Sequence, residues 1–174
     1  MEELILVEPT KQLEPLLLAY KNEYIAHGET HINGSCSFMR YTDYDEWLNK
    51  VQSLTKIELT DGSVPATTYF LLRQSDNKIV GSIQLRHQLN DYLRASGGHI
   101  GYSICPTERR KGYATWQLRQ VLKIAQQMNI PKVMITCDKS NAASAKTAVK
   151  CGGVLTWEGY CEKEIIQVYW IDLF

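Results

Sequence analysis

The chain opens with a short apolar run and then changes to apolar positions at helical spacing. Residues 4–7 are rich in β-forming side chains, which predicts a first strand. A helix is predicted after it, because apolar residues recur three or four positions apart. They are Leu13, Leu16, Leu17, Tyr20 and Tyr24. Residues 28–41 are polar and contain glycine, so we expect a loop there.

A second helix is predicted from about Asp43, a residue that can cap the first turn. Its apolar positions are Tyr44, Trp47, Leu48, Val51 and Leu54. Over residues 67–73 and 78–89 the apolar positions instead follow the period of two that is typical of strands. Turn-forming residues 75–77 join the two segments, so we predict a hairpin. Residues 98–105 are the next predicted strand.

The clearest helical stripe in the chain covers residues 113–128. Its apolar positions are Ala114, Leu118, Val121, Leu122, Ala125 and Met128. Residues 133–137 are apolar on both faces and predict a central strand, and residues 141–150 predict a short helix stopped by Gly152 and Gly153. Closing strands are predicted near 154–161 and 165–173. The pattern indicates one mixed α/β domain over residues 1–174.

Composition narrows the classes of function and the partners we expect. Nineteen basic residues balance nineteen acidic ones, so no overall field favours nucleic acid or anionic lipid. The five cysteines include no C-x-x-C pair, and Cys105 and Cys137 fall in predicted inner strands, which favours packed, reduced thiols. The amino terminus lacks a basic segment followed by an apolar one, and no apolar run approaches the ~20 residues of a membrane span. We therefore expect a cytoplasmic protein with no nucleic-acid or membrane partner.

One segment has the residue types of a metal site, His27-Gly-Glu29-Thr-His31. Its order differs from H-E-x-x-H, Gly28 weakens a helix, and the sequence offers no evident third ligand. A surface loop is the favoured interpretation, and no metal is expected.

The segment with the strongest chemical signal is residues 104–114, where a predicted strand ends and a basic turn opens directly into the 113–128 helix. Amides at the start of a helix have no partner inside it, so a phosphate can accept several of them together. Gly112 lets the backbone approach the phosphate closely, while Arg109, Arg110 and Lys111 add positive charge. The alternative, a solvated basic turn, is less consistent with this arrangement.

This segment resembles the Q/R-x-x-G-x-G/A motif of the GNAT acetyltransferase superfamily. Arg109, Gly112 and Ala114 match the motif and Pro106 stands upstream, as it often does in the family. A strand, an Asn-initiated helix and Gly152 follow in the expected order. The residues Gly-Gly-His-Ile-Gly-Tyr at 97–102 further resemble a branch known mainly as predicted acetyltransferases. The resemblance implies a mostly antiparallel, twisted sheet that splays between its fourth and fifth strands and is flanked by helices.

The resemblance also implies where acetyl-CoA binds. The pantetheine arm would lie against the backbone of Tyr102, Ser103 and Ile104 on the fourth strand. The pyrophosphate would rest on the amides of the basic turn, which are those of Arg110, Lys111, Gly112, Tyr113 and Ala114. Asn141 and Ser144 would contact the cofactor from the following helix. For Asn141 a helix N-cap is an alternative role compatible with this contact.

Two departures from the family pattern concern proton transfer. Many members carry a tyrosine seven positions after the asparagine, where Ala148 stands here. The glutamate base often found near the start of the fourth strand is also absent, and His99 lies near its place. Another tyrosine or a water would have to replace the missing acid. We expect His99, if any side chain, to accept the amine proton, with a water relay held by the backbone and by Tyr102 as the other candidate. A structural, hydrogen-bonded histidine is the alternative.

The expected reaction is direct attack of a deprotonated amine on the thioester, with a backbone N–H of the fourth strand stabilising the oxyanion. The amine could belong to a small molecule or to a peptide. A non-catalytic acyl-CoA-binding module is the alternative, because Ala148 removes the usual acid. A nucleotide-binding enzyme is disfavoured, since neither G-x-x-x-x-G-K-[ST] nor G-x-G-x-x-G occurs. The closing strands could also pair two copies into a homodimer.

Overall fold

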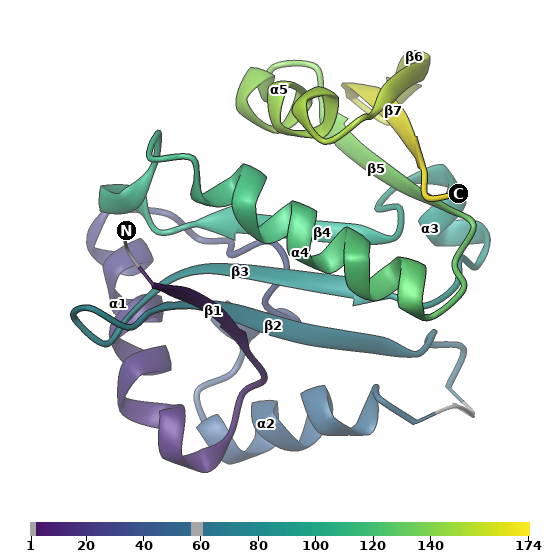
Figure 1. Cartoon of the computed structure of the whole chain (residues 1–174). Helices are drawn as coiled ribbons and strands as arrows, with labels where there is room; N and C mark the ends of the chain where they lie inside the picture. The colour runs from purple at the N-terminus through teal and green to yellow at the C-terminus, as the bar shows by residue number, and fades with distance from the viewer. Residues whose placement is uncertain (1–2, 57–60) are drawn as a thin grey trace.

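Two antiparallel sheets form the centre of the computed structural model, which describes residues 3–56 and 61–174. In spatial order, the strands of the first sheet are β1 (Leu4–Val7), β2 (Ala66–Arg73), β3 (Lys78–Arg86) and β4 (Ile100–Ile104). Those of the second are β5 (Lys132–Asp138), β7 (Glu164–Asp172) and β6 (Val154–Cys161), as Figure 1 shows. The mixed α/β fold with a mostly antiparallel sheet is thus confirmed.

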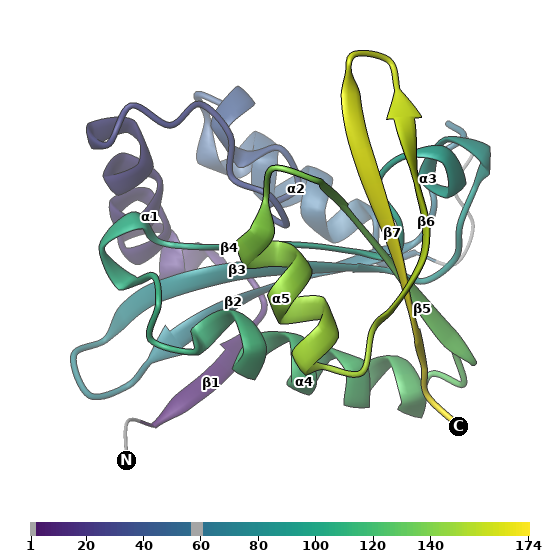
Figure 2. The ribbon, with the colours of Figure 1, turned by 90° about the horizontal axis from the view of Figure 1, so that it is seen from above.

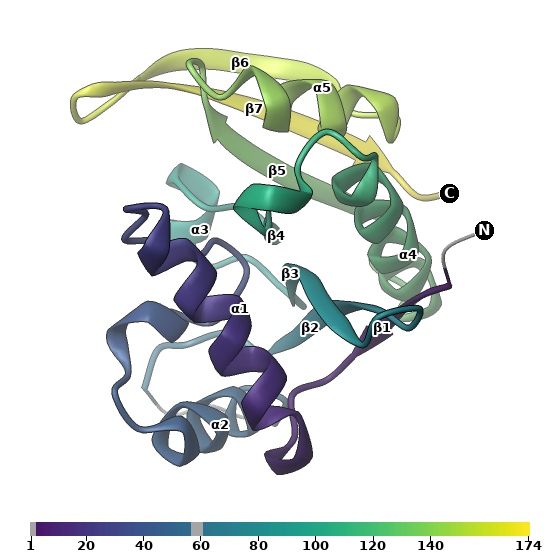
Figure 3. The ribbon, with the colours of Figure 1, turned by 90° about the vertical axis from the view of Figure 1, so that its left-hand side faces the viewer.

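Helices cover both faces of the first sheet. Two of them, α1 (Glu14–Ala26) and α2 (Tyr44–Ser53), lie on one face, and α4 (Tyr113–Gln127) lies on the other (Figures 2 and 3). The shorter α5 (Ala142–Lys150) lies beside the second sheet. The remaining helical turns are α3 (Asp91–Ala95), η1 (Lys11–Leu13), η2 (Phe38–Arg40) and η3 (Pro106–Glu108). No helix in the described part of the chain is long and apolar enough to cross a membrane.

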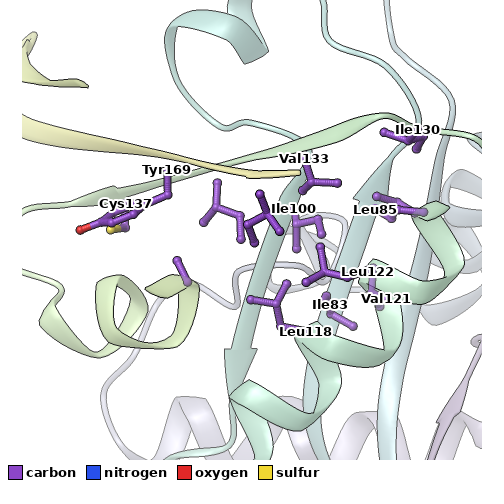
Figure 4. Close-up of a cluster of buried hydrophobic side chains, with 14 residues drawn as sticks. Ile83, Leu85, Ile100, Leu118, Val121, Leu122, Ile130, Val133, Cys137 and Tyr169 are labelled. Carbon is purple, nitrogen blue, oxygen red and sulfur yellow. The ribbon is translucent and has the colours of Figure 1, made fainter. Parts of the chain in front are cut away.

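The predicted helical stripe of α4 faces the core except at Met128, which lies just after the helix and is exposed. Leu118 and Val121 are fully buried, and they belong to one cluster with Ile83 of β3 and Ile100 of β4 (Figure 4). The same cluster includes Val133 of β5, so α4 packs against both sheets. Burying one such side chain contributes about 1.5–3 kcal/mol, which explains why this periodicity was a reliable signal.

Most predicted elements are confirmed, and the differences have local causes. The second hairpin strand ends at Arg86 rather than at residue 89, because the chain turns into α3. The Asn90 side chain caps this short helix by accepting from the Leu93 N–H at 2.9 Å. The fourth strand covers only residues 100–104 of the predicted 98–105, since Gly98 has a positive φ of 63°.

The two sheets diverge between β4 and β5, as the resemblance implied. Within the described residues these strands share no ladder, although the His99 N–H donates to the Met134 carbonyl at 2.8 Å at one end. The predicted central position of β5 is therefore correct only in part. It pairs along its length with β7, and on its other side the described hydrogen bonds to the β4 segment are those between Met134 and His99, just before β4.

The predicted loop at residues 28–41 is confirmed apart from the single turn η2, and it packs onto the first sheet. Ser35 is fully buried, and its carbonyl accepts from the Trp47 indole N–H at 2.9 Å. Gly34 has a φ of +76°, and a Cβ built there would lie 2.3 Å from the Gly101 carbonyl oxygen of β4. The loop can approach β4 this closely only because residue 34 has no side chain.

We expect Gly34→Ala to lower the free energy of unfolding at least twice as much as Gly28→Ala. Gly28 has a similar φ of +71°, but no atom lies within 4 Å of a Cβ built there. The loss of stability in Gly28→Ala therefore reflects only the left-handed backbone strain, about 1–2 kcal/mol. The loss in Gly34→Ala contains the same strain and also the clash with the Gly101 backbone. Urea denaturation of both variants measures the difference, and equal losses would contradict the close docking of the loop.

Candidate active site

The basic turn after β4 exposes backbone amides at the start of α4. Gly112 is the N-cap of this helix, with a φ of 85°, and no side chain caps the first turn. The first helical bond runs from the Trp116 N–H to the Gly112 carbonyl at 3.0 Å. The preceding amides of Ala114 and Thr115 therefore have no carbonyl of the helix to bond to. Their dipoles make this end of α4 favourable for an anion.

A buried carboxylate holds the basic turn in place. Glu108 is only 5% exposed, and its two oxygens accept from both Nη atoms of Arg73 at 2.7 and 3.1 Å. Lys78 and Lys111 donate to the same carboxylate at 2.9 and 2.7 Å. These hydrogen bonds, that of Arg73 foremost, keep the pKa of Glu108 well below its usual range. The carboxylate thus remains charged and joins the turn to the β2–β3 hairpin.

The backbone of β4 presents alternate residues to the gap between the sheets. The Cys105 N–H bonds to the Val80 carbonyl of β3, so the hydrogen-bonding groups of Ser103 face β3 as well. Those of Tyr102 and Ile104 therefore point away from β3, toward β5. Of the three residues predicted to bind pantetheine through their backbone, Tyr102 and Ile104 are the two oriented for it.

The side chain of Tyr102 connects β4 to α5. Its hydroxyl lies 2.9 Å from the Ser144 Oγ and 3.1 Å from the Ser144 carbonyl oxygen. Burial raises the pKa of Tyr102 to about 12, so the phenol keeps its proton at neutral pH. Ala148 is fully buried in the core cluster against which Tyr102 packs.

Asn141 is the N-cap of α5, as the sequence suggested. Its Oδ1 accepts from the Ser144 N–H at 3.1 Å at the start of α5. Asn141 is itself exposed, and both it and Ser144 line the cleft described next. The cap therefore leaves Asn141 in a place where its side chain can also meet a ligand.

A cleft of about 800 Å³ lies where β4, the basic turn and α5 meet. Most residues predicted to bind the cofactor line it together. They are Tyr102, Ser103, Ile104, Arg109, Arg110, Gly112, Tyr113, Ala114, Asn141 and Ser144. The other cations that line it are Lys146 and Lys150 of α5. Local charge therefore suits a polyanion, although the chain as a whole is neutral.

Two predicted site residues are not brought to this cleft. Lys111 does not line it, and its ammonium group is bound to Glu108. His99 is only 7% exposed, and its Nδ1 accepts from the Met134 N–H at 2.9 Å. Burial, helped by Arg94 and Arg86, lowers the pKa of His99 to about 4. The geometry therefore favours the alternative interpretation of His99, a structural, hydrogen-bonded residue, at the point where the chain enters β4 beside β5.

Sequence reasoning missed one wall of the cleft. Tyr24 at the end of α1 and Glu29, His31 and Asn33 of the following loop all line it. The Tyr24 hydroxyl donates to the Ser103 Oγ at 3.1 Å, and that Oγ donates to the Asn33 carbonyl at 2.9 Å. The loop interpretation of residues 28–41 was correct, but nothing in the local pattern indicated which surface the loop covers. Among the described residues, no cluster of histidine, cysteine, aspartate or glutamate could hold a metal ion.

The family comparison matches this geometry. The sequence model described as the acetyltransferase (GNAT) domain matches residues 10–154 of the chain. Among curated proteins, no sequence matches significantly.

Solved structures share the fold. Ribosomal-protein-S5-alanine acetyltransferase from Vibrio fischeri has a TM-score of 0.75 at 16% identity, covering 99% of this chain and 94% of that one. Microcin C7 self-immunity acetyltransferase, in complex with acetyl-CoA and AMP, has a TM-score of 0.68 at 15% identity, with 99% and 93% covered. A chimera of spermidine N-acetyltransferase from Vibrio cholerae has a TM-score of 0.64 at 14% identity, with 98% and 95% covered.

The buried, neutral His99 predicts a pH dependence of stability. Its pKa in the folded state, about 4, lies below the ordinary value of 6.5 expected in the unfolded chain. Between these values the unfolded state binds a proton that the folded state does not, so stability falls as pH drops through this window. The loss from this one group is up to about 3 kcal/mol.

The matched variant is His99→Gln, whose amide oxygen can still accept from Met134 but does not titrate. We expect the loss of stability between pH 7 and pH 4, measured by urea denaturation, to be smaller in this variant than in the parent. The same loss in both proteins would show that His99 is not the group responsible.

Proposed function

The chain belongs to the GNAT acetyltransferase family, and from this we propose that it transfers an acetyl group from acetyl-CoA directly to an amine. Family membership makes it an N-acetyltransferase; the cofactor, the acceptor and the mechanism are our proposal. The observation that carries the proposal is one cleft that is lined both by the start of α4, with its open amides, and by the β4 residues whose backbone points away from β3.

The residues of the cleft fit acetyl-CoA. No atom lies within 4 Å of a Cβ built at Gly112, so a phosphate has room against this backbone. Arg110 lines the cleft beside it and adds positive charge. The outward-facing groups of Tyr102 and Ile104 would hold the amide groups of the pantetheine arm, as an added strand would. The fold neighbour in complex with acetyl-CoA supports this assignment.

When bound, acetyl-CoA supplies a thioester carbonyl that a neutral amine can attack. We assign to Tyr102 the proton given to the departing sulfur, since this residue lines the cleft and its hydroxyl remains protonated at neutral pH. Tyr102 lies between β4 and α5, and from there it can replace the family tyrosine, whose usual position is occupied by Ala148 in this chain. The amine proton passes to water, because the His99 ring is buried and already bonded to Met134.

The acceptor is an amine of a small molecule or a peptide. Fold neighbours include enzymes named for the alanine of ribosomal protein S5 and for spermidine, and both classes of amine are consistent with an open cleft. The cytoplasmic location stays a prediction. A homodimer formed through the closing strands also stays a prediction. It is supported by the edge strand β6, which exposes Leu155, Trp157 and Tyr160.

We expect Gly112→Glu to weaken acetyl-CoA binding at least tenfold, because the new carboxylate occupies and repels the phosphate position. Gly62→Glu is the matched control: its φ is +77°, it too has no atom within 4 Å, and it does not line the cleft. Isothermal titration calorimetry measures both affinities. Undiminished affinity in Gly112→Glu would place the phosphates elsewhere.

We expect Tyr102→Phe to lower kcat for acetyl transfer by about 10²-fold, the lower range for loss of a general acid. Affinity for acetyl-CoA should change little, because the backbone of β4 is retained. Tyr160→Phe, at a tyrosine that is 76% exposed, controls for the substitution itself. Mass spectrometry of a panel of amines measures turnover, and an unchanged kcat in Tyr102→Phe would transfer the proton-donor role to water.

A further inference from the structure

An ion pair crosses the cleft at the end of β4. Nη2 of Arg109 lies 2.8 Å from Oε2 of Glu29, and Nε of the same side chain donates to the Ile104 carbonyl at 3.1 Å. Arg109 is the arginine of the phosphate-binding motif, and Ile104 is one of the two residues whose backbone faces the gap between the sheets. The ion pair therefore engages two groups that the proposed cofactor would use.

Glu29 is the exchangeable carboxylate of the cleft. The described residues that line the cleft include two carboxylates, Glu29 and Glu108. Glu108 is buried and fixed by Arg73, Lys78 and Lys111. The Glu29 side chain is 34% exposed and that of Arg109 is 46% exposed. Exposed pairs of this kind are weak, whereas an arginine binds a phosphate through charge-assisted, often bidentate, hydrogen bonds.

Charge also divides the cleft into two sides. The cations Arg110, Lys146 and Lys150 lie on the side of the basic turn and α5. Glu29 lies on the other wall, on the loop after α1, together with Tyr24, His31 and Asn33. A positively charged acceptor would be repelled from the first side and attracted to the second.

We propose that cofactor binding exchanges the anion on Arg109. A phosphate of CoA replaces the Glu29 carboxylate, and the released carboxylate then binds the ammonium group of a cationic acceptor. This inference rests on the proposed function and adds a substrate class to it. The exchange couples the two sites, so the cofactor and a cationic acceptor should each tighten the binding of the other by the same factor.

The first test is calorimetric titration of acetyl-CoA into the parent, Glu29→Gln and Glu158→Gln. Glu158 is also an exposed partner of a cation, Lys139, but it does not line the cleft. We expect Glu29→Gln to bind about two- to fivefold more tightly than the parent, because Arg109 no longer has a competing anion. Glu158→Gln should bind like the parent. A parent that does not bind acetyl-CoA would refute the proposed function, whereas a parent that binds with no gain in Glu29→Gln would refute the exchange alone.

The second test concerns the acceptor and uses CoA, which cannot turn over. Spermidine and a peptide with a free N-terminal alanine are titrated into the parent and Glu29→Gln, each with and without saturating CoA. We expect at least one probe to bind the parent more tightly with CoA present, and Glu29→Gln to lose about tenfold in affinity for it. Equal affinity in the two proteins, or no binding of either probe to the parent with CoA, would overturn the assignment of Glu29 to the acceptor.

Discussion

The separation of β4 from β5 is the constraint on which the rest of the site depends. At one end His99 binds Met134 through both its backbone N–H and its ring, so the two strands are held together there. Beyond that point they share no ladder in the described chain, and the backbone of Tyr102 and Ile104 is left facing the gap. Unpaired strand edges normally invite another strand. In this protein such an edge lies beside the start of α4, and our proposal assigns it to the pantetheine arm of the cofactor.

Electrostatic interactions in this protein are local rather than global. The net charge is zero, but Arg73, Lys78 and Lys111 converge on Glu108 behind the basic turn. Burial makes this cluster structural, since breaking one partner of a buried pair leaves an uncompensated charge. The ion pair between Arg109 and Glu29 at the cleft is exposed to solvent instead of buried. It costs little to break, and for that reason it can respond to a ligand.

The two walls of the cleft come from distant parts of the chain. One wall consists of the basic turn and the start of α5, where helix termini and cations favour phosphates. The other is the loop after α1, held against β4 by the close approach of Gly34 to Gly101 and by the hydroxyl contacts of Ser103. A cofactor bound at the first wall and an acceptor bound at the second would meet at the end of β4.

By itself the sequence determined the elements and the basic turn at the start of α4. Helical spacing in α4, the caps at Asp43 and Asn141 and the strand-to-helix turn at Gly112 are local features, and each was correctly located. Only the tertiary structure decided how side chains far apart in the chain pair. It directed His99 to Met134, brought Arg73 to Glu108 and placed Glu29 against Arg109. Local periodicity and capping are set by neighbouring residues, whereas burial, pKa and ion pairing depend on which distant segments the fold brings into contact.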